Sequence, residues 1–153
     1  MSCLLEVNRL LEVGEGRQRL CERALAQTLQ QARNCDSELQ AVVAQWTGLR
    51  QLLGQSTLQD RLLGRAELAR HLAQTAVLRR QAHTLELEIV GLKERQQDLL
   101  DTCANHRHQR LALAHKQRKY QQLHRQLCHQ QHVRQSRSDE AQTEDLIASR
   151  TRS

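Results

Sequence analysis

Proline is absent from this chain of 153 residues, so no residue forces a break in a long helix, and apolar residues recur along it with a period of seven. Before residue 54 the period is carried by two series of positions: Leu4, Leu11, Gln18, Leu25, Ala32, Leu39, Trp46 and Leu53, and then Val7, Gly14, Cys21, Thr28, Cys35, Val42 and Leu49. Positions three and four apart share one face of a helix, so the two series form a seam that can pack against another helix. The sequence predicts a first helix over about residues 3–53, weakened at Gly14, Gln18 and Thr28.

Turn-favouring residues cluster between Gly54 and Gly64, which predicts a bend over about residues 54–65. Gly64 is predicted to cap a second helix, with Glu67 at its third position. This second helix is predicted over about residues 66–135. Its seam is the series Ala82, Leu85, Ile89, Leu92, Gln96, Leu99, Cys103, His106, Arg110, Leu113, Gln117, Tyr120, His124 and Leu127.

Two long helices joined by one bend predict an all-α fold, a long antiparallel two-helix coiled-coil hairpin that forms a single unit over residues 1–153. The second helix is the longer, so its residues beyond about 115 are predicted to extend past the first helix. Residues 136–153 lose the apolar period and are predicted to fray. Polar seam residues, Gln96 and Gln117 among them, predict that the far end of the second helix packs least well alone.

The composition argues against a globular domain, a membrane protein and an enzyme. With no Phe, one Trp and one Tyr, the chain lacks the large side chains that fill a globular core. No apolar run approaches the length of a membrane span and the first residues show no secretory signal, so we expect a cytosolic protein without membrane insertion. A two-helix hairpin offers no concave pocket for catalysis, so no enzyme activity and no cofactor are expected. The five scattered cysteines form no CxxC pair and are interpreted as small apolar residues.

The net charge is concentrated near the C-terminus. Residues 1–53 hold six basic and six acidic residues, residues 54–103 hold seven of each, and residues 104–137 hold eight basic residues and no acidic one. Solvated helices usually mix charges at i, i+4 spacing. A run without carboxylates instead favours an acidic or polyanionic partner, although a merely solvated basic face is the alternative.

Three further alternatives stay open at this point. Nucleic-acid binding would use the Arg and Lys residues on phosphates, but only Tyr120 is present to stack on a base and no known DNA-binding motif is found. Metal binding would use the i, i+4 pairs that Cys128 forms with His124 and His132, but no carboxylate joins them, so no metal site is predicted. A structural or adaptor coiled coil of unrelated origin is the third.

Three runs within Leu49 to Ile147 carry a resemblance to a known family. They are Leu78-Arg-Arg-Gln-Ala-His-Thr-Leu-Glu-Leu-Glu-Ile-Val-Gly-Leu92, His115-Lys-Gln-Arg-Lys-Tyr-Gln-Gln-Leu123 and Glu140-Ala-Gln-Thr-Glu-Asp-Leu-Ile147. With them the chain resembles the InvI/SpaM proteins of bacterial type III secretion systems, relatives of YscO and FliJ. It departs from the family in Leu123-His-Arg-Gln-Leu127, where aromatics are usual, and at Gly64, where a capping Ser is expected.

The resemblance implies an antiparallel coiled coil that acts as the central stalk of the export ATPase. The end that bears the termini would enter the pore of the ATPase hexamer, and the end with the bend would face the export gate in the inner membrane. Export chaperones are implied as further partners, and nucleic acid is not. The implied location is the bacterial cytoplasm, peripheral to the inner membrane at the secretion apparatus.

The resemblance and the charge pattern together predict two sets of partner-binding residues. The positions that match the family's basic-aromatic motif on the ATPase side are Lys116, Arg118, Lys119 and Tyr120, to which the basic run adds Arg107, Arg110 and Arg125. The residues predicted on the export-gate side, near the bend, are Leu72, Arg79 and Arg80.

Overall fold

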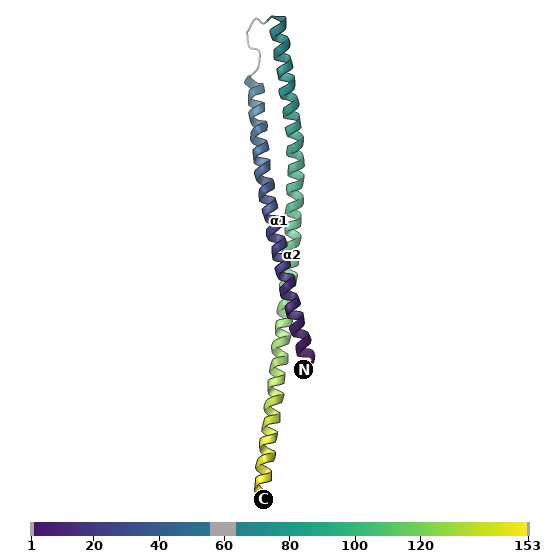
Figure 1. Ribbon diagram of the computed structural model, residues 1–153, viewed down its shortest axis with the longest axis vertical. Coiled ribbons are helices and arrows are strands. Elements are labelled where there is room, and N and C mark those ends of the chain that lie inside the picture. The colour runs from purple at the N-terminus through teal and green to yellow at the C-terminus, as the bar shows by residue number, and fades with distance from the viewer. Residues whose placement is uncertain (1, 56–63, 153) are drawn as a thin grey trace. The chain divides into compact units, whose positions relative to one another are not determined.

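The computed structural model describes residues 2–55 and 64–152, and these residues form two helices and no strand (Figure 1). Helix α1 spans Ser2–Gln55 and helix α2 spans Arg65–Thr151. The two helices pack against each other along the seams that the seven-residue period predicts. The predicted fold class, an all-α antiparallel two-helix coiled-coil hairpin, is confirmed.

Gly64 sets the start of α2. Its main-chain carbonyl accepts a hydrogen bond from the N–H of Leu68 at 3.0 Å, so Gly64 occupies the predicted N-cap position. Glu67 lies in the first turn, where its negative charge is favourable at the positive end of the helix dipole. The remainder of the predicted bend, residues 56–63, lies outside the described residues.

Helix α2 continues to Thr151, well past the end at about residue 135 that the apolar period predicts. The segment 136–151, where the sequence predicts fraying, is helical. Losing the apolar period removes packing partners but not the main-chain hydrogen bonds, and a helix that has already formed adds further residues at low cost. Arg150 in the last turn adds a favourable positive charge at the negative end of the dipole.

The chain divides into two compact units, and each of them contains parts of both helices. We call Met1–Ala24 with His106–Ser153 the terminal unit, and Leu25–Asn105 the central unit. Each unit is described separately below.

The packing within each unit is antiparallel. In the terminal unit, Leu11 of α1 is hydrogen-bonded to Gln117 of α2. Cys21, which comes later in α1, is hydrogen-bonded to His106, which comes earlier in α2. In the central unit, the thiol of Cys35 donates to the main-chain carbonyl of Leu92 at 3.4 Å. The indole of Trp46, later in α1, reaches Glu86, earlier in α2.

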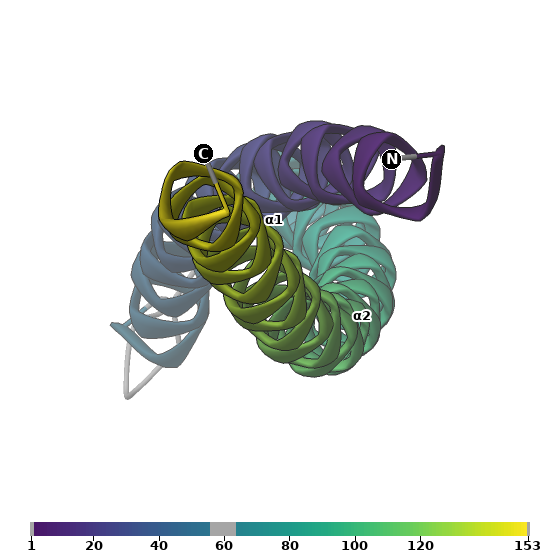
Figure 2. The ribbon, with the colours of Figure 1, turned by 90° about the horizontal axis from the view of Figure 1, so that it is seen from below.

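In the terminal unit, α2 extends past the first residues of α1, and Figure 2 shows the ends labelled N and C apart from each other. Packing against α1 nevertheless reaches past residue 115, since Gln117 is 5% exposed and Tyr120 and His124 are half-buried. The predicted start of the extension, at about residue 115, is therefore wrong. Val7, in the second turn of α1, is buried in the same unit, and residues 137–152 of α2 are all exposed.

The core is a thin line of mostly small residues at predicted seam positions. Its apolar members are Val7, Cys21, Leu25, Cys35, Ala82 and Cys103, and its polar members are Thr28 and Gln117. Three of the five cysteines are thus buried, as the interpretation of cysteine as a small apolar residue predicts. Two helices bury only a narrow stripe, so larger seam residues such as Leu85 and Ile89 stay half-buried.

Candidate partner-binding surfaces

Gln117 fastens the basic part of α2 to α1. Its Nε2 donates a hydrogen bond to the main-chain carbonyl of Leu11 at 3.0 Å. A Cβ atom on Gly14 would overlap the side-chain oxygen of Gln117, so the glycine leaves the space that the amide occupies. The sequence treats Gly14 and Gln117 as separate weak points, whereas the structure brings them together as one packed contact.

A second contact holds the start of the basic segment. The thiol of Cys21 donates to the main-chain carbonyl of His106 at 3.3 Å. The face of α2 that carries His106 and Gln117 is therefore turned toward α1. Side chains on the other faces of this segment point to solvent.

Apart from Arg110, the predicted basic residues lie on those other faces. Six of them are exposed: Arg107, Arg110, Lys116, Arg118, Lys119 and Arg125. Tyr120 is half-buried because it belongs to the seam, so only part of its ring is available to a partner. Arg110 also belongs to the predicted seam series, but its long side chain reaches solvent.

The terminal unit carries the whole net charge of the chain. It holds 14 basic and 8 acidic residues, whereas the central unit holds nine of each. Within residues 2–55 and 64–152, no ion pair involves a basic residue between Arg107 and Arg137, and the pair of Arg19 with Glu15 at 3.6 Å lies within α1. The basic side chains from Arg107 to Arg137 are thus presented without a neutralising carboxylate from the described residues.

One histidine of the same segment, His124, lies close to a cysteine. Cys128 Sγ lies 3.8 Å from Nε2 of His124, one turn away along α2. In the described part of the chain, no group of three or more His, Cys, Asp or Glu side chains is placed to hold a metal ion.

The residues predicted on the export-gate side lie in the central unit. Leu72 is 57% exposed, and Arg79 and Arg80 are exposed too. Consecutive residues of a helix point about 100° apart, so the two arginines lie on different faces of α2. The structure therefore does not make them a single paired site.

Trp46 lies at the edge of the seam in the central unit and is half-buried. Its indole N–H donates to Oε1 of Glu86 at 3.1 Å, and the guanidinium carbon of Arg50 lies 5.4 Å from the centre of its ring. Glu86 also lies 3.8 Å from Nδ1 of His83. These contacts give the chain's one tryptophan a fixed polar environment.

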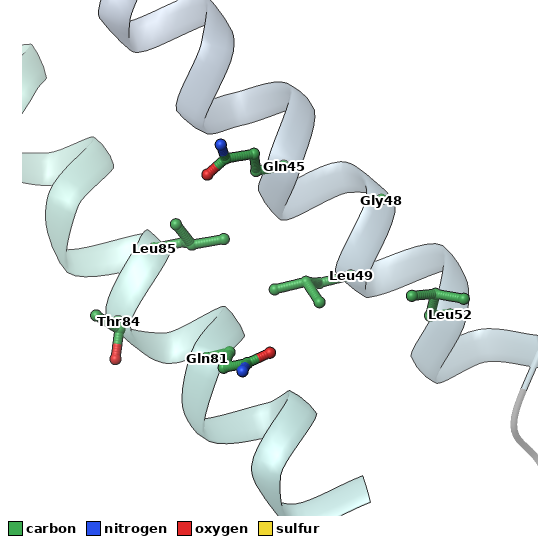
Figure 3. A pocket seen from close by; sticks show the side chains of 7 residues that line it. All are labelled: Gln45, Gly48, Leu49, Leu52, Gln81, Thr84 and Leu85. Atoms are coloured by element: carbon green, nitrogen blue, oxygen red, sulfur yellow. The ribbon is translucent and has the colours of Figure 1, made fainter. Parts of the chain in front are cut away.

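Sequence reasoning missed a groove on one side of the central unit. It has a volume of about 560 Å³, and its walls are Gln45, Gly48, Leu49 and Leu52 of α1 and Gln81, Thr84 and Leu85 of α2 (Figure 3). Leu49 and Leu85 point toward each other from the two helices. The signal was available beside the seam, where Gln45, Gly48 and Leu52 follow the same spacing of three and four residues.

Among the described residues, neither helix contains a stretch long and apolar enough to span a lipid bilayer. A model of the family described as Salmonella surface presentation of antigen gene type M protein matches residues 5–147. Comparisons with curated proteins and with solved structures give no match. The three sequence runs that resemble the InvI/SpaM proteins all lie within the matched residues.

Proposed function

The chain belongs to the surface presentation of antigen M (SpaM/InvI) family of type III secretion apparatus proteins, and from this premise we propose that it is the central stalk that couples the export ATPase to the export gate. In this proposal it works in the bacterial cytoplasm, at the inner-membrane face of the secretion apparatus. The chain hydrolyses nothing itself. Its part is to bind two other components, one through each of the two units.

The observation that carries the proposal is the charge of the terminal unit. All of the net charge lies there, and the basic side chains of α2 between Arg107 and Arg137 have no carboxylate partner within the described chain. An extended helix with unpaired cations fits a ring-shaped partner whose inner lining is acidic or polar. In the proposal this ring is the hexameric export ATPase, and Lys116, Arg118 and Lys119 are the central residues of the surface that would contact it.

Coupling follows from the mismatch between one stalk and several identical subunits. A single hairpin contacts the subunits of a ring unequally, so it favours a different conformation in each of them. The differences in affinity between these conformations for the stalk set the free energy that couples hydrolysis to export.

The other contact is assigned to the central unit, near the bend. This unit has no net charge and exposes Leu72, Arg79 and Arg80. A neutral surface with exposed apolar side chains suits a protein partner, and in the proposal this partner is the export gate.

Charge reversal tests the ATPase contact. The variant carries Lys116→Glu, Arg118→Glu and Lys119→Glu, and its matched control carries Arg33→Glu, Arg65→Glu and Lys93→Glu, three exposed residues of the central unit. We expect the first variant to bind the purified cognate ATPase at least about tenfold more weakly and to lose its stimulation of hydrolysis. The control is expected to keep both.

The wild-type interaction should also weaken as the salt concentration rises, because exposed charges are screened. Binding and stimulation that are the same for the first variant, the control and the wild type would contradict the assignment of this surface.

A further inference from the structure

The groove at Leu49 and Leu85 is part of a longer hollow on one side of the central unit. A neighbouring hollow shares Gln81 with it and is lined by Ala73, Gln74, Val77, Leu78 and Gln81. Another is lined by Glu38, Ala41, Val42, Glu88, Gly91, Leu92 and Arg95. Along α1 the lining runs from Glu38 to Leu52 in steps of three and four residues, so it follows one face for about 21 Å, roughly four turns.

Two glycines line this hollow, although no neighbouring atom of the described chain requires a glycine at either position. A Cβ atom on Gly48 or on Gly91 would meet nothing within 4 Å. Each lies inside a helix, where glycine is less favourable than alanine. The absence of a side chain at these positions leaves room for a close approach from outside the chain.

The lining of the hollow and its two edges, one on each helix, differ in charge. No charged residue lines the part of the hollow from Gln45 to Leu52 on α1 and from Ala73 to Leu85 on α2. Arg80 borders it on α2, because it is three residues after Val77 and four before Thr84, and its side chain is exposed. The edge on α1 is neutral, with the exposed residues Ser37, Ala44 and Gln51.

We propose that this hollow, the central groove, docks one α-helix of a partner protein. That helix is amphipathic, with an apolar stripe of about two turns that fills the space above Gly48. Polar residues continue it toward Gly91, where Glu38, Glu88 and Arg95 line the hollow. Acidic residues follow the edge of the stripe that faces Arg80. The docked helix would complete a three-helix packing in which Leu49, Leu52 and Val77 become buried. The groove does not include the basic residues of the terminal unit, so its test is independent of the proposed ATPase contact. Arg80, which borders the groove, also belongs to the surface proposed for the export gate.

The test uses the full-length protein and a synthetic peptide of about 18 residues, held helical by a side-chain crosslink, with a Leu and Ala stripe and Glu along one edge. Its binding is measured by fluorescence anisotropy, beside a second peptide in which Lys replaces each Glu. We expect saturable binding of the Glu peptide and weaker binding of the Lys peptide at low salt. Arg80→Glu should reverse this preference, whereas Lys93→Glu, the same charge change at an exposed residue on a different face, should preserve it.

A variant whose side chain fills the groove provides the second part of the test. Gly48→Leu should weaken binding of the Glu peptide at least about tenfold. Gly16→Leu should leave it unchanged, since Gly16 is also open to solvent but lies in the terminal unit. Circular dichroism verifies that both variants stay helical.

The proposal is overturned if the wild-type protein shows no saturable binding, or if Gly48→Leu binds the peptide as well as the wild type does. It is also overturned if light scattering shows a dimer that Gly48→Leu abolishes, since the occupant is then a second copy of this chain.

Discussion

The side-chain amide of Gln117 and the main-chain carbonyl of Leu11 are joined by a hydrogen bond of 3.0 Å between residues that are 106 positions apart in the sequence. The bond crosses from α2 to α1 over Gly14, where a Cβ atom would occupy the place of the Gln117 side-chain oxygen. A buried polar side chain in a coiled-coil seam reduces apolar burial, but it fixes which residues lie opposite each other. Gln117 and Gly14 therefore set the register that holds the basic segment of α2 in place.

Replacing Gly14 with Ala is expected to give a less stable protein than the same replacement at Gly16, although alanine favours helix at both positions. The new methyl group displaces the flexible amide of Gln117 and breaks its hydrogen bond to Leu11, a loss of about 0.5–1.5 kcal/mol that offsets the gain in helix propensity. Gly16→Ala is the matched control, since a Cβ there meets nothing within 4 Å and the variant should gain about 0.5–1 kcal/mol. Thermal unfolding followed by circular dichroism measures both changes.

The double variant Gly14→Ala with Gln117→Ala isolates the contact. Removing the Gln117 amide removes the overlap, so the two substitutions together should cost less than the sum of their separate effects. Strict additivity, or a Gly14→Ala variant as stable as Gly16→Ala, would show that the two residues do not meet.

Gln117→Glu is expected to make stability depend on pH. At neutral pH a buried carboxylate faces the Leu11 carbonyl without a proton to donate, at a cost of about 1–3 kcal/mol relative to wild type. Burial raises the pKa of the introduced carboxyl above its unfolded value of about 4.3. The folded state then binds the proton more tightly than the unfolded state, so the stability that the protonated group contributes is present at low pH and is lost as pH rises through the raised pKa.

The measurement is the difference in free energy of unfolding between Gln117→Glu and the wild type at a series of pH values. This difference should shrink as the pH falls below the raised pKa and become constant below about pH 4.3, where the carboxyl is protonated in both the folded and the unfolded state. A difference that is constant with pH would mean that the side chain at position 117 turns out to solvent.

The cysteines should divide into two classes of reactivity toward a maleimide. Cys3 and Cys128 are exposed and should be modified quickly. Cys21, Cys35 and Cys103 are buried, the last at 1% exposure, and should react only through local opening of the helices. Mass spectrometry of the modified protein at increasing times counts the labelled thiols, and a denatured sample, in which all five react, is the control. Fast modification of Cys103 would contradict the packing of α2 against α1.

The seam was predictable from the sequence because helix geometry alone places residues three and four apart on one face. Every buried residue, from Val7 to Gln117, belongs to a series that the seven-residue period defines. The N-cap at Gly64 was predictable for a similar reason, since the signal is local to the first turn of α2. The exposure of Lys116, Arg118 and Lys119 follows directly once the seam is known.

Features that depend on register or on the distance between the helices were not predictable in this way. The period shows that Gln117 and Leu11 each lie on a seam, but not that they lie opposite each other. The sequence also does not show which residues of α1 lie opposite which residues of α2. For this reason the extension of α2 was expected to start too early, at about residue 115. The hollow between Leu49 and Leu85 depends on how closely the two helices approach, which no local pattern records.

The hydrogen bond between Trp46 and Glu86 offers an optical test of the central unit. Glu86→Ala removes the acceptor 3.1 Å from the indole nitrogen and should expose the ring to more water, which shifts the tryptophan emission to longer wavelength. The loss of stability should stay below about 1 kcal/mol, because both side chains keep partial contact with solvent. Glu88→Ala is the control, since this exposed carboxylate lines the hollow at Gly91 and has no contact with the indole. Trp46 is the chain's one tryptophan, so emission unchanged in Glu86→Ala would mean that the two helices do not meet in this register.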